Sequence, residues 1–253
     1  MTTMTIDLTF FAFAIPAVLF AGISKGGFGS GAAFAATAFL AVILEPVVAL
    51  GLMLPLLLLM DFGGLRPYWR KWDWGAARNL VIGSVPGIVL GALFFRATNP
   101  DALRFLIGVV AIAFVAYQGA KARGWTSASS AAASGRGGFL AGVLVGFISF
   151  VSHSSGPVVA IYLLRRGLSK TTFQATTVIV FWAVNGMKIL PYAALGVFTG
   201  DILRAALYLS PFALIGVWAG VWFHRVVSKK LFFLITYVLL LTTGSKLIWD
   251  ALV

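Results

Sequence analysis

The chain has 253 residues, of which 60% are hydrophobic and only 10% are charged, and its mean hydropathy is +1.00. A soluble core could not cover that much apolar surface, so the composition excludes an ordinary soluble domain and indicates an integral membrane protein. The formal net charge of +12 comes from Lys and Arg in short loops between apolar segments, which the positive-inside rule explains better than a nucleic-acid partner does.

Apolar stretches recur along the chain, and many reach the roughly 20 residues that a helix needs to cross a ~30 Å hydrocarbon layer. They are apolar on every face, whereas the strands of a membrane barrel alternate in polarity. The predicted fold class is therefore an all-α polytopic membrane protein. The expected helices of the first half are Leu8 to Gly22, Gly26 to Leu44, Pro46 to Met60, Ala76 to Phe95 and Ala102 to Gln118. Those of the second half are Gly137 to Val151, Pro157 to Leu164, Thr171 to Leu195, Leu203 to Phe223 and Leu231 to Leu252.

Two features bear on processing and redox chemistry. No Lys or Arg precedes Lys25, so the N-terminal region does not resemble a secretory signal and we expect it to be retained. The chain contains no cysteine, which excludes disulfides and cysteine metal sites.

Matching residues recur at a spacing of 124 positions, which predicts an internal repeat. The pairs are Gly22 with Gly146, Asp61 with Asn185, and Pro67-Tyr68 with Pro191-Tyr192. We expect two membrane repeats, 1–120 and 137–253, joined by a cytoplasmic linker at 121–136 and forming a single transmembrane domain; a chance match of so few residues is the alternative. Because Pro157 to Leu164 is too short to span, each repeat should combine a broken re-entrant helical hairpin with three transmembrane helices.

The basic loops predict the orientation of the chain. We expect the cytoplasmic loops to be those that carry Arg66, Arg70, Lys71 and Arg78; Lys121, Arg123 and Arg136; Arg165, Arg166 and Lys170; and Arg225, Lys229 and Lys230. The loops around Glu45, Asn99 and Asp201 should face outward. This assignment inverts the second repeat relative to the first and places both termini outside, in a cell inner membrane or plasma membrane. Inverted repeats with broken helices are typical of secondary transporters.

The first expected break, GISKGGFGSG at 22–31, has five glycines in ten residues. Such a sequence disfavours a continuous helix and lets backbone N–H groups approach a ligand, so we expect a new helix to begin at Gly26. Lys25 costs about 2.5–3.5 kcal/mol at the membrane centre on insertion scales, and should line an aqueous cavity or bind an anion. The alternatives are a small-residue packing surface and a Lys25 side chain that reaches the outer interface.

The second expected break, FVSHSSGP at 150–157, places Ser154 or Ser155 as an N-cap and Pro157 in the first turn of a helix. Two helix N-termini at the hairpin tips would attract a small oxyanion at the membrane midplane. The predicted substrate-binding residues are Ser24, Lys25, Gly26, Gly27, Gly29, Ser30, Ser152, His153, Ser154, Ser155, Gly156, Asn185 and Lys188.

Two titratable residues have more than one interpretation. Asp61 and His153 are candidates for proton coupling. Asp61 alternatively pairs with Lys25 or Lys188, or is a solvated cap near the cytoplasmic end, and His153 alternatively only orients a serine. No metal site and no cofactor is predicted.

Several stretches resemble the sulfite exporter TauE/SafE family of membrane permeases. They are GISKGGFGSG at 22–31, MLPLLLLMDFGGL at 53–65, GFISFVSHSSGPVVAIYLL at 146–164 and TTVIVFWAVNGMKILPYAALG at 176–196. The resemblance covers nearly the whole chain and implies transport of sulfite or organosulfonates. This sequence has Ser154-Ser155-Gly156 where the family pattern is richer in small residues and glycine, which leaves the particular substrate open.

The predicted function is secondary transport of a small sulfur oxyanion, sulfite or an organosulfonate such as sulfoacetate, by alternating access. An inside-negative potential contributes about 2.3 kcal/mol per charge per 100 mV to anion export, so we expect export. The alternatives are a small-anion channel, a proton-coupled importer, an intramembrane serine hydrolase that uses His153, and a structural subunit. We expect no enzyme activity. The expected partners are the anion and the lipid bilayer, and no feature predicts an oligomeric state.

Overall fold

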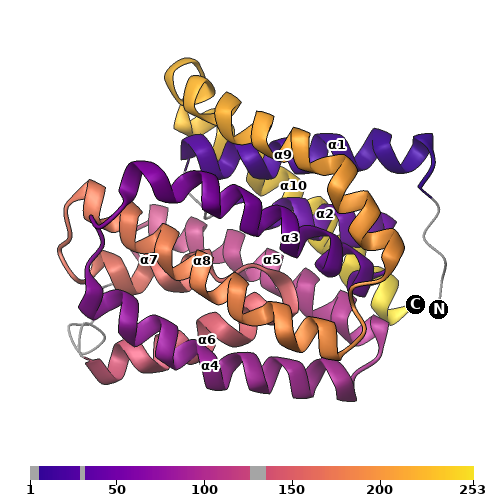
Figure 1. Ribbon diagram of the computed structural model, residues 1–253, viewed down its shortest axis with the longest axis horizontal. Coiled ribbons are helices and arrows are strands. Elements are labelled where there is room, and N and C mark those ends of the chain that lie inside the picture. Colours follow the sequence, from indigo (N-terminus) through magenta and orange to yellow (C-terminus); the bar gives the residue numbers. More distant parts are fainter. Residues whose placement is uncertain (1–5, 29–31, 126–134) are drawn as a thin grey trace.

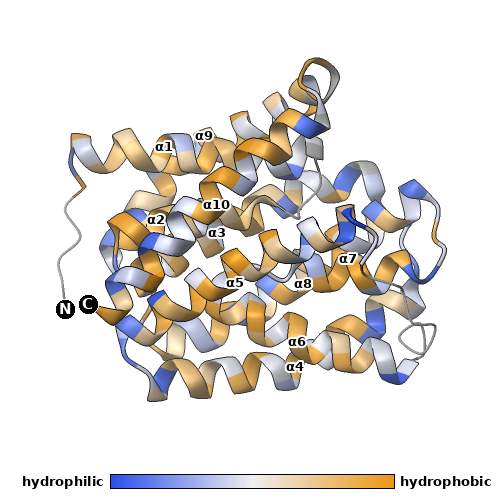
Figure 2. Ribbon diagram, turned by 180° about the vertical axis from the view of Figure 1, so that it is seen from behind, coloured by the Kyte–Doolittle hydropathy of each residue, from blue (hydrophilic) through white to orange (hydrophobic). Residues whose placement is uncertain are grey.

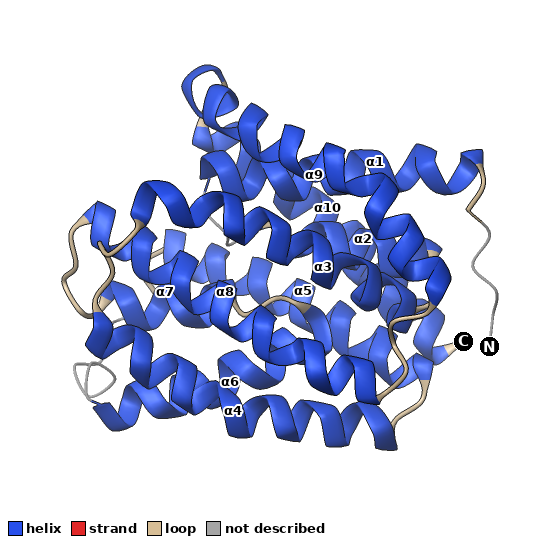
Figure 3. Ribbon diagram, viewed as in Figure 1, coloured by secondary structure: helices blue, strands red, loops and turns tan. Residues whose placement is uncertain are grey.

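The computed structural model describes residues 6–28, 32–125 and 135–253, and every regular element in these ranges is helical (Figure 3). The helices in chain order are α1 (Leu8–Ile23) with a π-helical turn (Ser24–Phe28), α2 (Phe34–Ile43), α3 (Pro46–Leu65) with a 3₁₀ turn (Arg66–Tyr68), α4 (Trp74–Ala97), α5 (Pro100–Ala122), α6 (Gly135–Ser152), α7 (Gly156–Leu164), α8 (Lys170–Ala194), α9 (Gly200–Val226) and α10 (Lys229–Leu252).

Eight helices of the described part are long and apolar enough to cross a membrane: α1 with most of its π-helical turn, α3, α4, α5, α6, α8, α9 and α10. The other two, α2 and α7, have only 10 and 9 residues, and at 1.5 Å per residue neither can span a bilayer. The prediction of an all-α polytopic membrane protein is therefore confirmed.

The first predicted break is misplaced. Ser24 to Phe28 continue α1 as a π-helical turn, and the next helix begins at Phe34 rather than at Gly26. The prediction treated the glycines as helix breakers. In the structure Gly26 and Gly27 are helical, and their backbone packs directly against α9. In the second half, α7 begins at Gly156, one residue from the predicted start.

The connections separate into two ends of the bundle (Figure 1). The loops between α3 and α4 and between α7 and α8 lie at one end. The loops between α4 and α5 and between α8 and α9 lie at the opposite end, together with the start of α1 and the end of α10. We call the first the basic end, because its loops carry Arg70, Lys71 and Arg166. Apolar residues dominate the helices between these ends (Figure 2).

Glycine faces let four helices pack at close range. Extensive contacts join α4 to α6 and α1 to α9. A Cβ at Gly87 would lie 2.1 Å from the Val143 carbonyl oxygen, and one at Gly146 would lie 2.2 Å from that of Ser84. Small residues at such positions allow helix backbones to touch without a hydrophobic driving force from water. These pairings hold the polar residues described next between α1, α3, α6 and α8.

Candidate functional site

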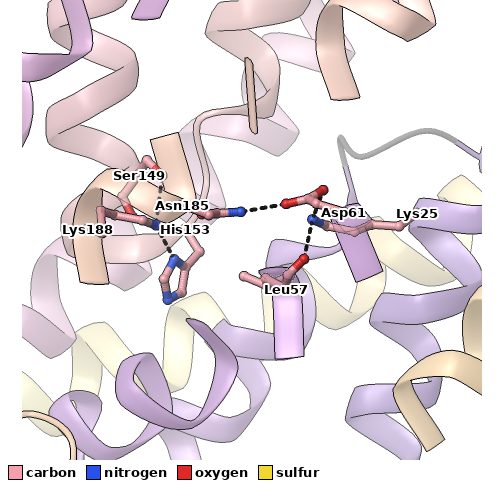
Figure 4. Close-up of polar contacts among 7 residues, drawn as sticks. All are labelled: Lys25, Leu57, Asp61, Ser149, His153, Asn185 and Lys188. Atoms are coloured by element: carbon pink, nitrogen blue, oxygen red, sulfur yellow. Dashed lines mark hydrogen bonds and ion pairs between the residues drawn. The ribbon is translucent and has the colours of Figure 1, made fainter. Parts of the chain in front are cut away.

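Lys25, Asp61 and Asn185 form a buried polar chain from three helical segments (Figure 4). The Lys25 Nζ donates to Asp61 Oδ1 at 2.5 Å and to the Leu57 carbonyl oxygen at 3.3 Å. The Asn185 Nδ2 donates to Asp61 Oδ2 at 2.8 Å. The side chains of Lys25 and Asp61 are only 8% and 3% exposed, so Lys25 does not extend to the interface. Of the alternatives for Asp61, the structure shows the ion pair with Lys25 and not a solvated cap.

Lys188 lies at the centre of a second buried group, formed by α6 and α8. Its Nζ donates to the backbone oxygen and to the Oγ of Ser149, both at 2.9 Å, and contacts His153 Nδ1 at 2.7 Å. Lys188 is fully buried. Three neighbouring acceptors match the three protons of an ammonium group, so the hydrogen-bonding capacity of Lys188 is used completely.

The contacts of His153 define its tautomer. Nδ1 accepts from the Lys188 ammonium, so Nε2 carries the proton and donates to the Leu50 carbonyl oxygen at 3.1 Å. The Leu50 carbonyl lies within α3. His153 is therefore a neutral imidazole with both nitrogens engaged. Neither nitrogen contacts a serine, so the Ser–His pair that a serine hydrolase needs is not formed among the described residues.

A left-handed backbone at His153 shapes the turn between α6 and α7. His153 has φ 56°, a region that non-glycine residues rarely adopt, although histidine is enriched there. Its N–H bonds the Ser149 carbonyl oxygen at 3.1 Å and ends α6. The Tyr192 hydroxyl donates to the Phe150 carbonyl oxygen at 2.6 Å, which ties the end of α6 to α8. This turn directs the imidazole towards Lys188.

The predicted serines differ in their hydrogen bonding. Ser152 Oγ donates to the Ile148 carbonyl oxygen, and Ser154 Oγ donates to the Ser152 carbonyl oxygen. Ser155 is the N-cap of α7, yet its side chain forms no capping bond, and its buried Oγ has no partner among the described residues. Ser24 is buried at the start of the π-helical turn. Buried hydroxyls normally find a partner, so Ser155 is an exception with a free polar atom.

The glycine-rich segment lies largely against another helix. A Cβ at Gly26 would lie 2.0 Å from the Val217 carbonyl oxygen, and one at Gly27 would lie 2.1 Å from that of Gly220. These two glycines thus allow the close approach of α9, as the packing interpretation expects. Gly156 opens α7. Gly29 and Ser30 lie outside the described residues.

One small cavity of about 20 Å³ connects the two polar groups. Lys25 and Asn185 line it from the first group, and Ser149 and His153 line it from the second. Ala33, Phe34, Leu57 and Phe181 complete its wall. Such a volume has room for about one water molecule, so the side chains themselves fill most of the site. We use the name polar cluster for the eight residues that line this cavity together with Asp61 and Lys188.

The polar cluster contains more basic than acidic side chains. The charges of Lys25 and Asp61 cancel, and His153 is neutral, but no ion pair reaches Lys188 in the described part of the chain. An uncompensated ammonium is costly away from water, so the cluster is suited to an anion that would neutralise it. The described residues contain no group of three His, Asp or Glu arranged for a metal ion.

Sequence reasoning missed three groups of the cluster: the Ser149 side chain and the backbone carbonyls of Leu50 and Leu57. The repeat spacing of 124 positions relates Lys25 to Ser149, so applying that spacing to Lys25 would have identified Ser149 as a candidate. Nothing in the sequence distinguishes the two carbonyls from others in α3.

Comparison with known proteins gives one match. The family model for Sulfite exporter TauE/SafE matches residues 14–247, nearly the whole chain. No curated protein matches, and no solved structure does.

Proposed function

Because the chain belongs to the sulfite exporter TauE/SafE family, a family of membrane transporters of sulfur anions, we propose that it is a secondary transporter whose substrate anion binds in the polar cluster. The substrate is sulfite or an organosulfonate such as sulfoacetate. Both present a compact, negatively charged set of oxygen acceptors, which ammonium, hydroxyl and backbone N–H donors bind well.

One observation carries this proposal: Lys188 is fully buried and has no carboxylate partner in the described part of the chain, although Asp61 lies in the same cluster and pairs with Lys25. One negatively charged group of the bound anion would balance the ammonium group of Lys188. It would replace one of the present acceptors of Lys188, and it would also accept from Lys25 and from Ser155, whose hydroxyl has no partner among the described residues. The selectivity for an anion follows from this charge balance.

Helix N-termini add to the positive potential of the cluster. Ala33 and Phe34, where α2 begins, line the small cavity, and α7 begins three residues after His153. The first N–H groups of a helix have no internal acceptor and favour an anion. Ala33 supplies no side-chain cap to α2, so its first N–H groups can serve the substrate. In this proposal the N-termini of α2, at Phe34, and of α7, at Gly156, both contribute N–H groups to the anion site.

The helix arrangement favours a carrier with inverted repeats. The positions related by 124 residues, Asp61 and Asn185, are in direct contact, as expected on the axis between two equivalent halves. Two extensive packing pairs also correspond, because α1 and α9 of one pair match α6 and α4 of the other. Alternating access then follows from an exchange of conformation between the halves. The small volume of the cluster cavity, about 20 Å³, also favours a carrier over an open anion channel.

The basic end is cytoplasmic in this proposal, so both termini face outward. An inside-negative potential drives a monoanion outward by about 2.3 kcal/mol per 100 mV, which makes export possible without a coupled ion. Proton-coupled import is the second candidate, because Asp61 and His153 each contact a lysine of the cluster. Protonation of either residue would change the charge that the anion meets.

Flux from proteoliposomes tests the proposal. Vesicles are loaded in turn with sulfite, sulfoacetate and sulfate, and efflux is compared between the intact protein, Lys188→Met and Lys246→Met. Lys246 is an exposed control that pairs with Asp250 on α10. We expect saturable efflux that Lys188→Met abolishes and Lys246→Met leaves unchanged. Normal, saturable efflux in a folded Lys188→Met variant would show that the anion site lies elsewhere.

The direction of transport and its coupling to protons need a second experiment. With a membrane potential and no proton gradient, efflux of the anion towards the positive side should accelerate. Accumulation that requires a proton gradient, and that Asp61→Asn or His153→Gln removes, would replace export by proton-coupled import.

A further inference from the structure

A larger cavity of about 190 Å³ opens at the basic end of the bundle, between α5, α7, α8 and α10. Its polar wall includes the exposed Lys121, together with Gln118, Gln174 and the buried Thr177. Aromatic rings of Phe114, Tyr117, Phe173 and Phe233 form much of the rest. A single ammonium group and two amides can bind an anionic group, and the aromatic side chains can pack against the apolar part of a small organic anion. This cavity is separate from the polar cluster, and we call it the port.

The port and the polar cluster lie along one face of α8. Phe173 and Thr177 line the port, while Phe181 and Asn185 line the cluster cavity. These four residues are spaced four apart, and residues with that spacing follow one side of a helix. The two cavities are therefore consecutive, with one helical turn between Thr177 and Phe181.

An aromatic contact separates the two cavities. Phe114 lines the port, Phe34 lines the cluster cavity, and their rings meet edge to face with centroids 5.1 Å apart. Both side chains are buried, at 6% and 2% exposure. A change of rotamer in either ring would join the two spaces without unfolding a helix.

The two halves of the bundle differ at this place. The short helix α2 of the first half packs against α10 of the second half. The corresponding pair is α7 of the second half with α5 of the first half, and among the described residues these two helices scarcely touch. The port occupies the space between them. The structure is thus looser at the basic end than at the related position of the other half.

We propose that the port is the access route by which an anionic substrate reaches the polar cluster from the basic end, and that the Phe34–Phe114 contact is its gate. This inference rests on the proposed function for the identity of the substrate. The route and the gate themselves are tested by labelling experiments that do not depend on transport.

Because the natural chain has no cysteine, single cysteines report access cleanly. Thr177→Cys marks the port, and Ala33→Cys marks the cluster cavity. The probe is a methanethiosulfonate that carries a sulfonate group, applied to vesicles from either side. We expect Thr177→Cys to react only from the side that the basic end faces, and Ala33→Cys to react slowly. In a Phe114→Ala background the Ala33→Cys reaction should accelerate by about tenfold or more.

Phe105→Ala is the matched control, because Phe105 is a phenylalanine on the same helix α5 but is 42% exposed and lines neither cavity. It should leave the Ala33→Cys rate unchanged. Phe34→Leu is the second gate variant, in case Phe114→Ala does not fold, and size-exclusion profiles check folding. A rate unaffected by both gate variants, or reaction of Thr177→Cys only from the opposite side, would overturn the inference.

Protection by substrate completes the test. Sulfoacetate is used rather than sulfite, because sulfite itself attacks the mixed disulfide formed by the probe. We expect sulfoacetate to slow the Thr177→Cys reaction and sodium chloride not to. If Lys188→Met keeps its flux while these access results hold, the proposed binding site fails and the route stands. If Lys188→Met loses flux while the access results fail, only the route is overturned.

Discussion

Asp61 and Asn185 are joined by a hydrogen bond of 2.8 Å from Nδ2 to Oδ2, although 124 positions separate them in the chain. The same spacing relates Gly22 to Gly146 and Pro67 to Pro191. Asp61 lies on α3 and Asn185 on α8, the helices that follow the short helices α2 and α7. The pair combines an acid with its neutral counterpart, so only one of the two contacting side chains can carry a charge.

Asp61→Asn tests whether the Asp61 carboxylate competes with the substrate for Lys25. The change keeps the side-chain shape but leaves Lys25 without its anion, so the free energy of unfolding without substrate should fall by about 3–5 kcal/mol. Because Lys25 is then free, KM should fall by about tenfold, equal to about 1.4 kcal/mol of binding. Thermal unfolding with and without sulfoacetate, together with flux at varied substrate, measures both effects. A KM that stays constant or rises would contradict this role.

Ser155→Ala separates a substrate contact from a structural one. The Ser155 Oγ is buried and has no partner among the residues that the structure describes, so its removal breaks no hydrogen bond seen there and should leave thermal stability unchanged or slightly higher. If the hydroxyl binds the anion, KM should rise by about tenfold. Ser154→Ala is the comparison, because it loses the bond to the Ser152 carbonyl oxygen and should lower stability instead. Unchanged flux in a stable Ser155→Ala variant would remove Ser155 from the site.

Gly146→Ala tests the glycine faces that hold the hairpins in place. The added Cβ would lie 2.2 Å from the Ser84 carbonyl oxygen on α4, and overpacking of this kind costs about 1–3 kcal/mol. Gly22→Ala, at the related position of the first half, meets the Ala213 oxygen on α9 at 2.8 Å and should act in the same direction. Gly63→Ala meets nothing within 4 Å and should raise stability by up to about 1 kcal/mol through helix propensity. Melting temperatures in detergent would refute the packing argument if all three variants behaved alike.

Labelling at the two ends of α4 tests the proposed orientation. Lys71→Cys lies in the loop before α4, and Ala97→Cys lies at its last residue. In intact cells a membrane-impermeant maleimide should label Ala97→Cys and should label Lys71→Cys only after permeabilisation, because the basic end is cytoplasmic. The reverse pattern would invert the topology and, with it, the direction of export inferred from the membrane potential.

The sequence by itself determined the number and character of most helices, because transfer of a ~20-residue apolar segment into lipid is a local property of that segment. It also singled out Lys25, Asp61, Asn185 and Lys188, since ionisable and polar groups within apolar spans are costly enough to need a purpose. The family resemblance rests on the same stretches and is confirmed by the family match over residues 14–247.

Only the tertiary structure decided which of these groups meet. The choice of Lys25 rather than Lys188 as the partner of Asp61, and of Ser149 and His153 as the partners of Lys188, depends on how α1, α3, α6 and α8 pack. The same packing keeps Gly26 and Gly27 helical against α9, where local propensity predicts a break. Contacts between helices arise from side-chain shape over long sequence separations, and a local pattern carries no record of them. The charge imbalance at Lys188, which carries the proposed function, therefore became visible only once the helices were assembled.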